Sequence, residues 1–259
     1  MLKQCLVFSL AIFGLQYAHA ENFHFCLENQ HVAPFLLGTG ALIEGQNGIV
    51  PDMLIRASKN LDNTITFERK PWKRCQAELA QGDIDAIAAF IFNEERDGWS
   101  VFPKTNGVLD DRFFYQSDYI IFTHPDSALS WDGYVLLPAS ANVQSSPGYI
   151  ADKKLQAMGF MPIAQLQARK ALPLVASQVL DGFIIDAVIG RTLINELGLE
   201  GKVIPLEIPF MSQQWYAAFS KATYTQRPDQ VEAFWTALKA VRIKDTEALF
   251  KHYEQPITY

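Results

Sequence analysis

The chain has 259 residues, enough for one large domain or for two lobes of about 100 to 120 residues each. Hydrophobic residues make up 49% of the chain and charged residues 19%, a composition that excludes an intrinsically disordered protein. The formal net charge of −6 has the wrong sign for a protein that binds a phosphate backbone, so we expect no nucleic-acid partner.

The first 20 residues have the pattern of a cleaved secretory signal. Lys3 is an early cation, an apolar run of about ten residues follows it, and small residues at Ala18 and Ala20 precede the expected cleavage site. The run is shorter than the roughly 20 apolar residues that a membrane anchor needs. We therefore expect residues 1–20 to be removed and the mature chain to begin at Glu21.

Export leaves Cys26 and Cys75 as an even pair in an oxidising compartment, because Cys5 lies in the expected signal. This predicts a disulfide between them; the alternative is two buried thiols. The sequence has neither a Cys-x-x-Cys motif nor a cluster of Cys and His residues, so we expect no thiol-redox role, no metal and no other cofactor.

The first third of the mature chain alternates expected strands with expected helices. Trp72, Cys75 and Leu79 follow helical spacing and predict the buried face of a helix that begins near a proline and ends before Gly82. The expected elements are strand 22–28, helix 49–60, strand 64–70, helix 71–81 and strand 84–92. This order is typical of an open α/β sheet.

A second α/β set follows, and then a tail that is mostly helical. The expected strands are 119–124, 134–139, 141–144, 183–190 and 215–222; the expected helices are 149–159, 165–182, 191–198, 227–241 and 245–253. The phrase Ile-Asp-Ala occurs at 84–86 and again at 185–187, each time near a glycine and within an apolar run. The repetition predicts two similar α/β lobes, with Asp85 and Asp186 as structural residues that accept local backbone N–H groups and not as a catalytic pair.

Several short motifs occur in an order that resembles a known family. They are Ala-Pro-Phe at 33–35, Gly48 with Asp52, Pro-Trp-Lys-Arg-Cys at 71–75, Gly-Asp-Ile-Asp-Ala-Ile at 82–87, Asn-Glu-Glu-Arg at 93–96 and Tyr-Ala-Ala-Phe-Ser-Lys at 216–221. In this order they resemble the bacterial extracellular solute-binding proteins of family 3, the amino-acid-binding type with the type II periplasmic binding fold. The Trp-x-Arg-Cys motif further resembles a subgroup common in Gram-negative bacteria.

The resemblance implies two open-sheet α/β lobes joined by crossover strands, with lobe 1 at 21–119 plus 213–259 and lobe 2 at 120–212. It implies a periplasmic monomer that captures a small ligand between the lobes without catalysis. The expected partner is either an ABC importer or a membrane sensor, and no feature of the sequence separates the two. The disulfide between Cys26 and Cys75 would then lie within lobe 1.

Arg96 matches the arginine that grips a ligand carboxylate in this family as a bidentate fork. The alternative is a surface arginine paired with Glu94 or Glu95. Phe90 and Ile91 match positions whose backbone groups contact ligand, although their bulk is equally suited to the core.

Two aromatic residues and a serine-rich loop complete the expected site. Phe35 and Trp72 are candidates for apolar walls, with plain core packing as the alternative. In lobe 2 the loop that usually donates backbone N–H groups to the carboxylate contains Pro147, which lacks that donor. The hydroxyls of Ser145 and Ser146 are its expected replacements.

Two positions depart from the family in a way that bears on the ligand. Relatives that bind α-amino acids hold the ammonium group with two acidic side chains, and the matching positions here are Asn29 and Arg191. We therefore expect a small anionic or polar ligand without a required α-ammonium group, held by Arg96 and Arg191. A shift of one residue in the alignment would bring Glu28 into the site instead of Asn29.

The alternative function is an enzyme on the same fold, since cyclohexadienyl dehydratases resemble this family. Such chemistry requires an acid with a raised pKa in the cleft, and Glu28 and Glu94 are the candidates. The histidines form no recognisable triad or metal-ligand spacing, and no Gly-x-Ser-x-Gly elbow is present, which excludes the common hydrolase patterns.

Overall fold

The computed structural model describes residues 22–42, 46–61 and 63–253. The expected signal at 1–20 and the expected first mature residue, Glu21, lie outside the described residues. Among the residues that are described, no helix combines the length and the apolar character that crossing a membrane requires.

In the described part of the chain, nine strands form one mixed sheet with the order β10-β11-β7-β13-β3-β1-β2, while β12 pairs with β7 and β4 with β13. Their bounds are β1 Asn22–Glu28, β2 Thr64–Lys70, β3 Ala86–Ile91, β4 Ser100–Val101, β7 Tyr115–Thr123, β10 Val143–Ser145, β11 Gly182–Asp186, β12 Ile204–Pro205 and β13 Met211–Ser220. Two short hairpins add β5 Lys104–Thr105 with β6 Val108–Leu109, and β8 Ser130–Trp131 with β9 Leu136–Leu137.

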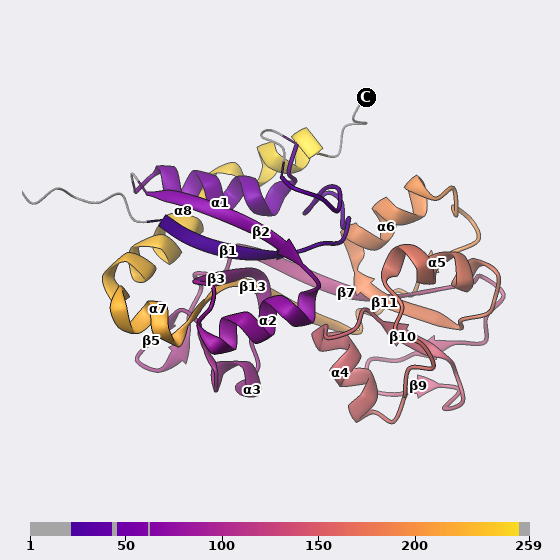
Figure 1. The fold of residues 1–259 in the computed structure, drawn as a ribbon. Coiled ribbons are helices and arrows are strands. Elements are labelled where there is room, and N and C mark those ends of the chain that lie inside the picture. The colour runs from indigo at the N-terminus through magenta and orange to yellow at the C-terminus, as the bar shows by residue number, and fades with distance from the viewer. Residues whose placement is uncertain (1–21, 43–45, 62, 254–259) are drawn as a thin grey trace, which may run out of the picture.

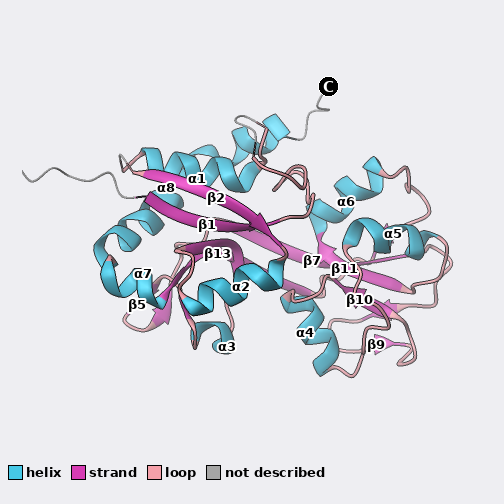
Figure 2. Ribbon diagram, viewed as in Figure 1, coloured by secondary structure: helices cyan, strands magenta, loops and turns pink. Residues whose placement is uncertain are grey.

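The helices lie on both faces of this sheet (Figure 2). Their bounds are α1 Ile49–Lys59, α2 Trp72–Gln81, α3 Glu94–Asp97, α4 Ile150–Ala157, α5 Ala168–Ala176, α6 Ala187–Glu196, α7 Lys221–Gln226 and α8 Pro228–Tyr253. Strands β1, β2 and β3 are parallel to one another, as expected for strands joined by helices. The architecture confirms the predicted α/β class.

Figure 1 shows the elements in two groups. Lobe 1 contains β1, β2, β3, α1, α2, α3, α7 and α8, and lobe 2 contains β10, β11, α4, α5 and α6. Strands β7 and β13 extend from one group to the other and pair in antiparallel fashion, with Tyr119 opposite Met211 and Tyr115 opposite Trp215. The expected boundaries at 119/120 and 212/213 thus fall within the paired crossover strands.

Lobe 1 is packed on both faces of its part of the sheet, as the alternating side chains of β1 dictate. Phe23 and Phe25 point to one face, where each lies 5.6 Å between ring centroids from Phe234 of α8. Cys26 points to the other face and forms a disulfide with Cys75 of α2, with their Cα atoms 5.5 Å apart. The predicted disulfide is confirmed, and it lies within lobe 1.

The second Ile-Asp-Ala phrase is not the structural equivalent of the first. Asp85 precedes β3, and its carboxylate accepts the His24 backbone N–H at 2.8 Å. Asp186 ends β11 and caps α6, accepting from the backbone N–H groups of Val188 and Ile189 at 2.9 Å each. The predicted strand 183–190 is therefore wrong in its second half, because the Asp186 cap starts a helix there.

Four other predicted elements differ clearly in extent. Strand 134–139 is reduced to the two residues of β9, and helix 165–182 to the nine residues of α5. The two helices predicted at 227–241 and 245–253 form one continuous helix, α8. The segment between them contains neither Gly nor Pro, and both Val241 and Leu249 are buried, so nothing ends the helix there.

Candidate functional site

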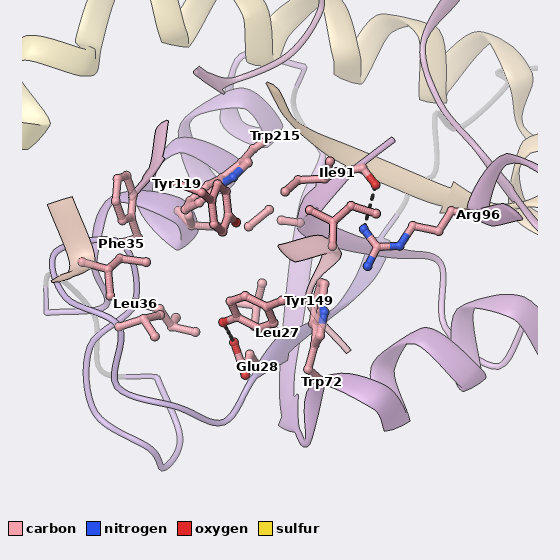
Figure 3. Close-up of a pocket in the computed structure, with 16 residues that line it drawn as sticks. Leu27, Glu28, Phe35, Leu36, Trp72, Ile91, Arg96, Tyr119, Tyr149 and Trp215 are labelled. Atoms are coloured by element: carbon pink, nitrogen blue, oxygen red, sulfur yellow. Dashed lines mark hydrogen bonds between the residues drawn. The ribbon is translucent and has the colours of Figure 1, made fainter. Parts of the chain in front are cut away.

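A cavity of about 60 Å³ lies where the carboxyl ends of β1 and β3 face lobe 2 (Figure 3). Its lining residues are Leu27, Glu28, Val32, Phe35, Leu36, Val50, Trp72, Ala88, Ala89, Ile91, Arg96, Tyr119, Tyr149, Ile150, Ile189 and Trp215. Glu28 and Arg96 are the charged members of this set, and most of the others are apolar. A cavity of this composition, apolar with a few polar groups, is typical of a small-molecule site.

Arg96 reaches the cavity from α3, the short helix that follows β3. Asn93 caps this helix by accepting the Arg96 backbone N–H at 2.8 Å. The guanidinium group donates from Nη1 to the Ile91 carbonyl oxygen at 2.7 Å and from Nη2 to the Gly148 carbonyl oxygen of lobe 2 at 3.2 Å. It also lies over the ring of Phe90, 4.1 Å from the ring centroid.

The Arg96 cation is buried without an anion beside it. Its side chain is 2% exposed, Nε has no hydrogen-bond partner, and burial lowers its pKa to about 10. Among the described residues, no carboxylate lies within 4.0 Å of the guanidinium nitrogens, and Glu95 pairs with Lys153 of lobe 2 instead. The alternative of a surface arginine paired with Glu94 or Glu95 is therefore wrong. A desolvated cation without a counter-ion is costly, and a ligand carboxylate would offset that cost.

Glu28, the last residue of β1, supplies the opposite charge. Its side chain is buried, and Oε2 accepts a hydrogen bond of 2.5 Å from the Tyr149 hydroxyl of lobe 2, while Oε1 has no partner. Burial raises the pKa of the Glu28 carboxyl group to about 7, against the lowering effects of the Tyr149 hydrogen bond and the Arg69 charge. The cavity therefore holds an acid whose pKa lies well above that of an ordinary glutamate.

The predicted apolar walls divide into lining residues and core. Phe35, Trp72 and Ile91 line the cavity, and Ile91 also positions Arg96 through its carbonyl group. Phe90 does not line it: the ring is fully buried and stacks on Phe102 with centroids 5.6 Å apart. The side chains of Phe90 and Ile91 point to opposite faces of β3, so only that of Ile91 faces the cavity. Phe90 instead packs its ring against the Arg96 guanidinium group.

The comparisons with known proteins bear on the fold. No protein-family model and no curated protein matches the chain. A histidine kinase sensor domain with similarity to periplasmic binding proteins is 15% identical, with a TM-score of 0.70 over 90% of this chain and 96% of that one. The substrate-binding protein of an ABC uptake transporter from Streptococcus pneumoniae, with bound histidine, is 15% identical, with a TM-score of 0.67 over 90% and 92%.

An ancestral amino-acid-binding protein, described as a precursor of cyclohexadienyl dehydratase, is also 15% identical, with a TM-score of 0.68 over 90% of this chain and 95% of that one. The chain has the type II periplasmic binding protein fold. At these identities the likeness shows the fold alone. One of these proteins is the substrate-binding protein of an ABC uptake transporter, and another is a sensor domain of a histidine kinase.

The binding-protein fold is closed around its cavity in this structure. Besides the Arg96–Gly148 and Glu28–Tyr149 hydrogen bonds, further side-chain contacts join lobe 1 to lobe 2 in the described part of the chain. Glu95 forms an ion pair with Lys153 at 2.5 Å, and Nε2 of His31 forms a hydrogen bond with Oε1 of Glu196 at 3.0 Å. The cavity lies at the carboxyl ends of strands, which is where open α/β sheets bind ligands.

Besides Phe90, four predicted site residues do not line the cavity. Asn29 follows β1, and its backbone N–H donates to the Lys70 carbonyl oxygen at 3.0 Å; Arg191 is exposed on α6. The Ser145 hydroxyl donates to the Ile184 carbonyl oxygen at 2.8 Å inside the sheet, and Ser146 is buried outside the lining set. Glu28 takes the place expected of Asn29, since successive side chains of an extended chain point in opposite directions.

Three aromatic residues that line the cavity were not predicted from the sequence: Tyr119, Tyr149 and Trp215. Tyr119 and Trp215 lie on the crossover strands, and only the pairing of β7 with β13 brings them to the cavity. Tyr149 did have a local signal, because it follows Gly148 and directly precedes the expected helix of lobe 2. Residues at such a strand-to-helix connection are well placed to face a ligand.

Proposed function

We propose that the protein is a periplasmic solute-binding protein of extracellular family 3, which captures a small carboxylate-bearing ligand between its two lobes. The observation that carries this proposal is Arg96, a buried cation that lines an apolar cavity without a carboxylate partner. Its planar fork suits a ligand carboxylate, which would replace the Gly148 carbonyl oxygen on Nη2 and satisfy Nε.

Lobe 2 supports the same assignment. Ile150, the first residue of α4, lines the cavity, so the amino-terminal end of this helix faces it. The partial positive charge at that end favours an anion there. Closure of two lobes on a ligand is the movement expected of this fold, with lobe 1 at 21–119 plus 213–259 and lobe 2 at 120–212 as the proposed moving bodies.

The proposed partner is a membrane protein that reads the closed form, either an ABC importer or a sensor. The likeness to an uptake protein and the likeness to a kinase sensor domain support both alternatives about equally. The disulfide and the signal-like first 20 residues support an oxidising compartment, and with them the periplasm.

A thermal-shift panel of short carboxylic acids and amino acids tests the proposal, with Arg96→Gln as the variant and Arg191→Gln as the matched control. A ligand at 100 times its Kd should stabilise the wild type by about 2.7 kcal/mol. We expect Arg96→Gln to lose at least 100-fold in affinity and Arg191→Gln, an exposed position, to change less than twofold. Wild-type affinity in Arg96→Gln would contradict the proposal.

A dehydratase-like enzyme is the second candidate, and Glu28 favours it. A buried acid with a pKa of about 7 is suited to protonating a leaving hydroxyl group. Incubation with a prephenate-type substrate distinguishes the two functions. We expect no product above the level seen with Glu28→Gln, and turnover that Glu28→Gln abolishes would establish the enzyme instead.

A further inference from the structure

We propose that Tyr149 selects the ligand class: its hydroxyl occupies the place on Glu28 that the ammonium group of an amino acid needs, so the site prefers short monocarboxylates without an amino group. This inference rests on the proposed function, in which Arg96 binds the ligand carboxylate. The residues concerned are drawn in Figure 3, where the Tyr149 hydroxyl points to the Glu28 carboxylate.

The backbone around Tyr149 holds the hydroxyl in this place. The Tyr149 N–H donates to the Ser146 carbonyl oxygen at 3.1 Å, and its own carbonyl oxygen accepts the Lys153 N–H at 3.3 Å in the first turn of α4. Glu28 is equally fixed as the last residue of β1, in register with Lys70 of β2. From these fixed backbone positions the two side chains come within hydrogen-bond distance of each other in this structure.

Glu28 stands alone as an acid at this cavity. Among the described lining residues it is the one carboxylate, and Arg191 is exposed. Asp186 is committed to the cap of α6 and to the Ser117 hydroxyl at 2.7 Å. An ammonium group would have to enter an apolar cavity with one carboxylate as its partner, whose Oε2 already accepts from Tyr149 and whose Oε1 is buried, and burying a charge so poorly paired is costly.

Displacing Tyr149 does not solve this problem. An ammonium group that took Oε2 would break the hydrogen bond from the Tyr149 hydroxyl, and the other carboxylate oxygen, Oε1, is buried, so the Glu28 carboxylate would have to turn before it could accept from Tyr149 again. An unmade hydrogen bond in a closed site costs more than a made one contributes. A ligand with a methylene group in place of the amine leaves the Glu28–Tyr149 pair intact. The geometry therefore favours the carboxylate without the amine.

The size of the cavity limits the ligand to a short chain. At about 10 to 15 Å³ for each water-sized group, 60 Å³ holds roughly four to six such groups. Leu27, Val32, Ile91 and Trp72 supply apolar surface for the chain. Propanoate and butanoate are probes within this size, and 3-methylbutanoate, which is one atom larger, tests its upper limit. Alanine, 2-aminobutyrate and valine are their amino counterparts.

Calorimetric titration of these three matched pairs tests the inference, with Tyr149→Phe as the variant. We expect the wild type to bind each carboxylate at least tenfold more tightly than its amino counterpart. Tyr149→Phe should raise the affinity for each amino acid about tenfold relative to that for its matched carboxylate, because it frees Oε2 of Glu28. Adding Glu28→Gln to Tyr149→Phe should abolish that gain.

The exposed tyrosine Tyr134 of lobe 2 provides the matched control, and Tyr134→Phe should bind like the wild type. An unchanged melting temperature shows that the Tyr149→Phe variant folds. Amino acids that bind the wild type more tightly than the carboxylates, or a preference that Tyr149→Phe leaves within twofold, overturn the inference while the proposed function stands. Failure of every acid to bind overturns both.

Discussion

Glu28 and Arg96 are buried in the same cavity, yet no ion pair joins them. Each is satisfied in part by a group of lobe 2, Glu28 by the Tyr149 hydroxyl and Arg96 by the Gly148 carbonyl oxygen. Each also keeps one unpartnered atom, Oε1 of Glu28 and Nε of Arg96. Such incomplete pairing costs stability in the absence of ligand and is the kind of cost that a binding site incurs for function.

The burial of the Glu28 carboxyl group predicts how the free energy of unfolding depends on pH. The pKa of Glu28 is near 4.5 in the unfolded chain and about 7 in the fold. Between these values the folded protein keeps a proton that the unfolded chain has lost, so the contribution of Glu28 to stability is full below pH 4.5 and is lost as the pH rises through 7. The loss amounts to about 3 kcal/mol.

Glu28→Gln removes this titration and keeps an oxygen that can accept from Tyr149. In urea unfolding without ligand, we expect the variant to gain about 3 kcal/mol relative to the wild type between pH 4.5 and pH 8. The raised pKa of Asp186, also caused by burial, is common to both proteins and cancels in the comparison. A constant difference across this range would show that Glu28 ionises alike in the folded and unfolded states.

At the scale of elements, Arg69 of β2 holds the loop that carries Val32 and Phe35 to the cavity. Its guanidinium group donates to five backbone carbonyl oxygens, those of Glu28, Gln30, Leu37, Gly38 and Gly40, at 2.8 to 3.3 Å. The loop then docks on α1, where Gly48 leaves no room for a Cβ atom because one would lie 2.6 Å from the Phe35 carbonyl oxygen.

Arg69→Lys should loosen this loop, because an ammonium group cannot reach five acceptors arranged around a planar fork. We expect a loss of about 2 to 3 kcal/mol in the free energy of unfolding and faster hydrogen exchange at the Leu37 and Gly38 amides. Arg74→Lys, at an exposed position of α2, is the matched control and should change stability by less than about 0.5 kcal/mol. Unaltered exchange at both amides in Arg69→Lys would contradict this role.

The elements that local pattern determines were predictable from the sequence. The alternation in β1, the apolar face of α2 and the cysteine pair needed no tertiary information. The position of Arg96 was predictable too, as it follows the end of a strand. The second Ile-Asp-Ala phrase led to the wrong prediction of a strand through residue 190. An aspartate within an apolar run can precede a strand, as Asp85 does, or cap a helix, as Asp186 does, and the local pattern does not distinguish the two.

The choice between Glu28 and Asn29 also lay beyond the sequence, because a shift of one residue reverses which side chain faces the cavity. Tyr149 and Trp215 depend on contacts between segments far apart in the chain. Tyr149 meets Glu28 across 121 positions, a pairing that no local pattern reports. The site residues that could not be predicted are thus those that reach the cavity only through contacts between distant segments of the chain.

For the whole molecule, the closed form should depend on the contacts that cross between the lobes. The His31–Glu196 hydrogen bond and the Glu95–Lys153 ion pair are partly exposed, so each contributes at most about 1 kcal/mol. We expect the double variant His31→Ala, Lys153→Ala to open the ligand-free protein, seen as a larger radius of gyration in solution scattering. Its ligand affinity should fall about two- to tenfold, because less of the protein is in the binding-competent form.

The Cys26–Cys75 disulfide offers the opposite case, since it joins β1 to α2 within lobe 1 and crosses no boundary. Replacing both cysteines with alanine should lower the free energy of unfolding by about 2 to 4 kcal/mol, as expected for a closed loop of this length. The radius of gyration and the affinity should stay unchanged, because closure does not involve this bond. Stability and closure are then separable properties, and a disulfide variant that opened the lobes would show that lobe 1 does not move as a rigid unit.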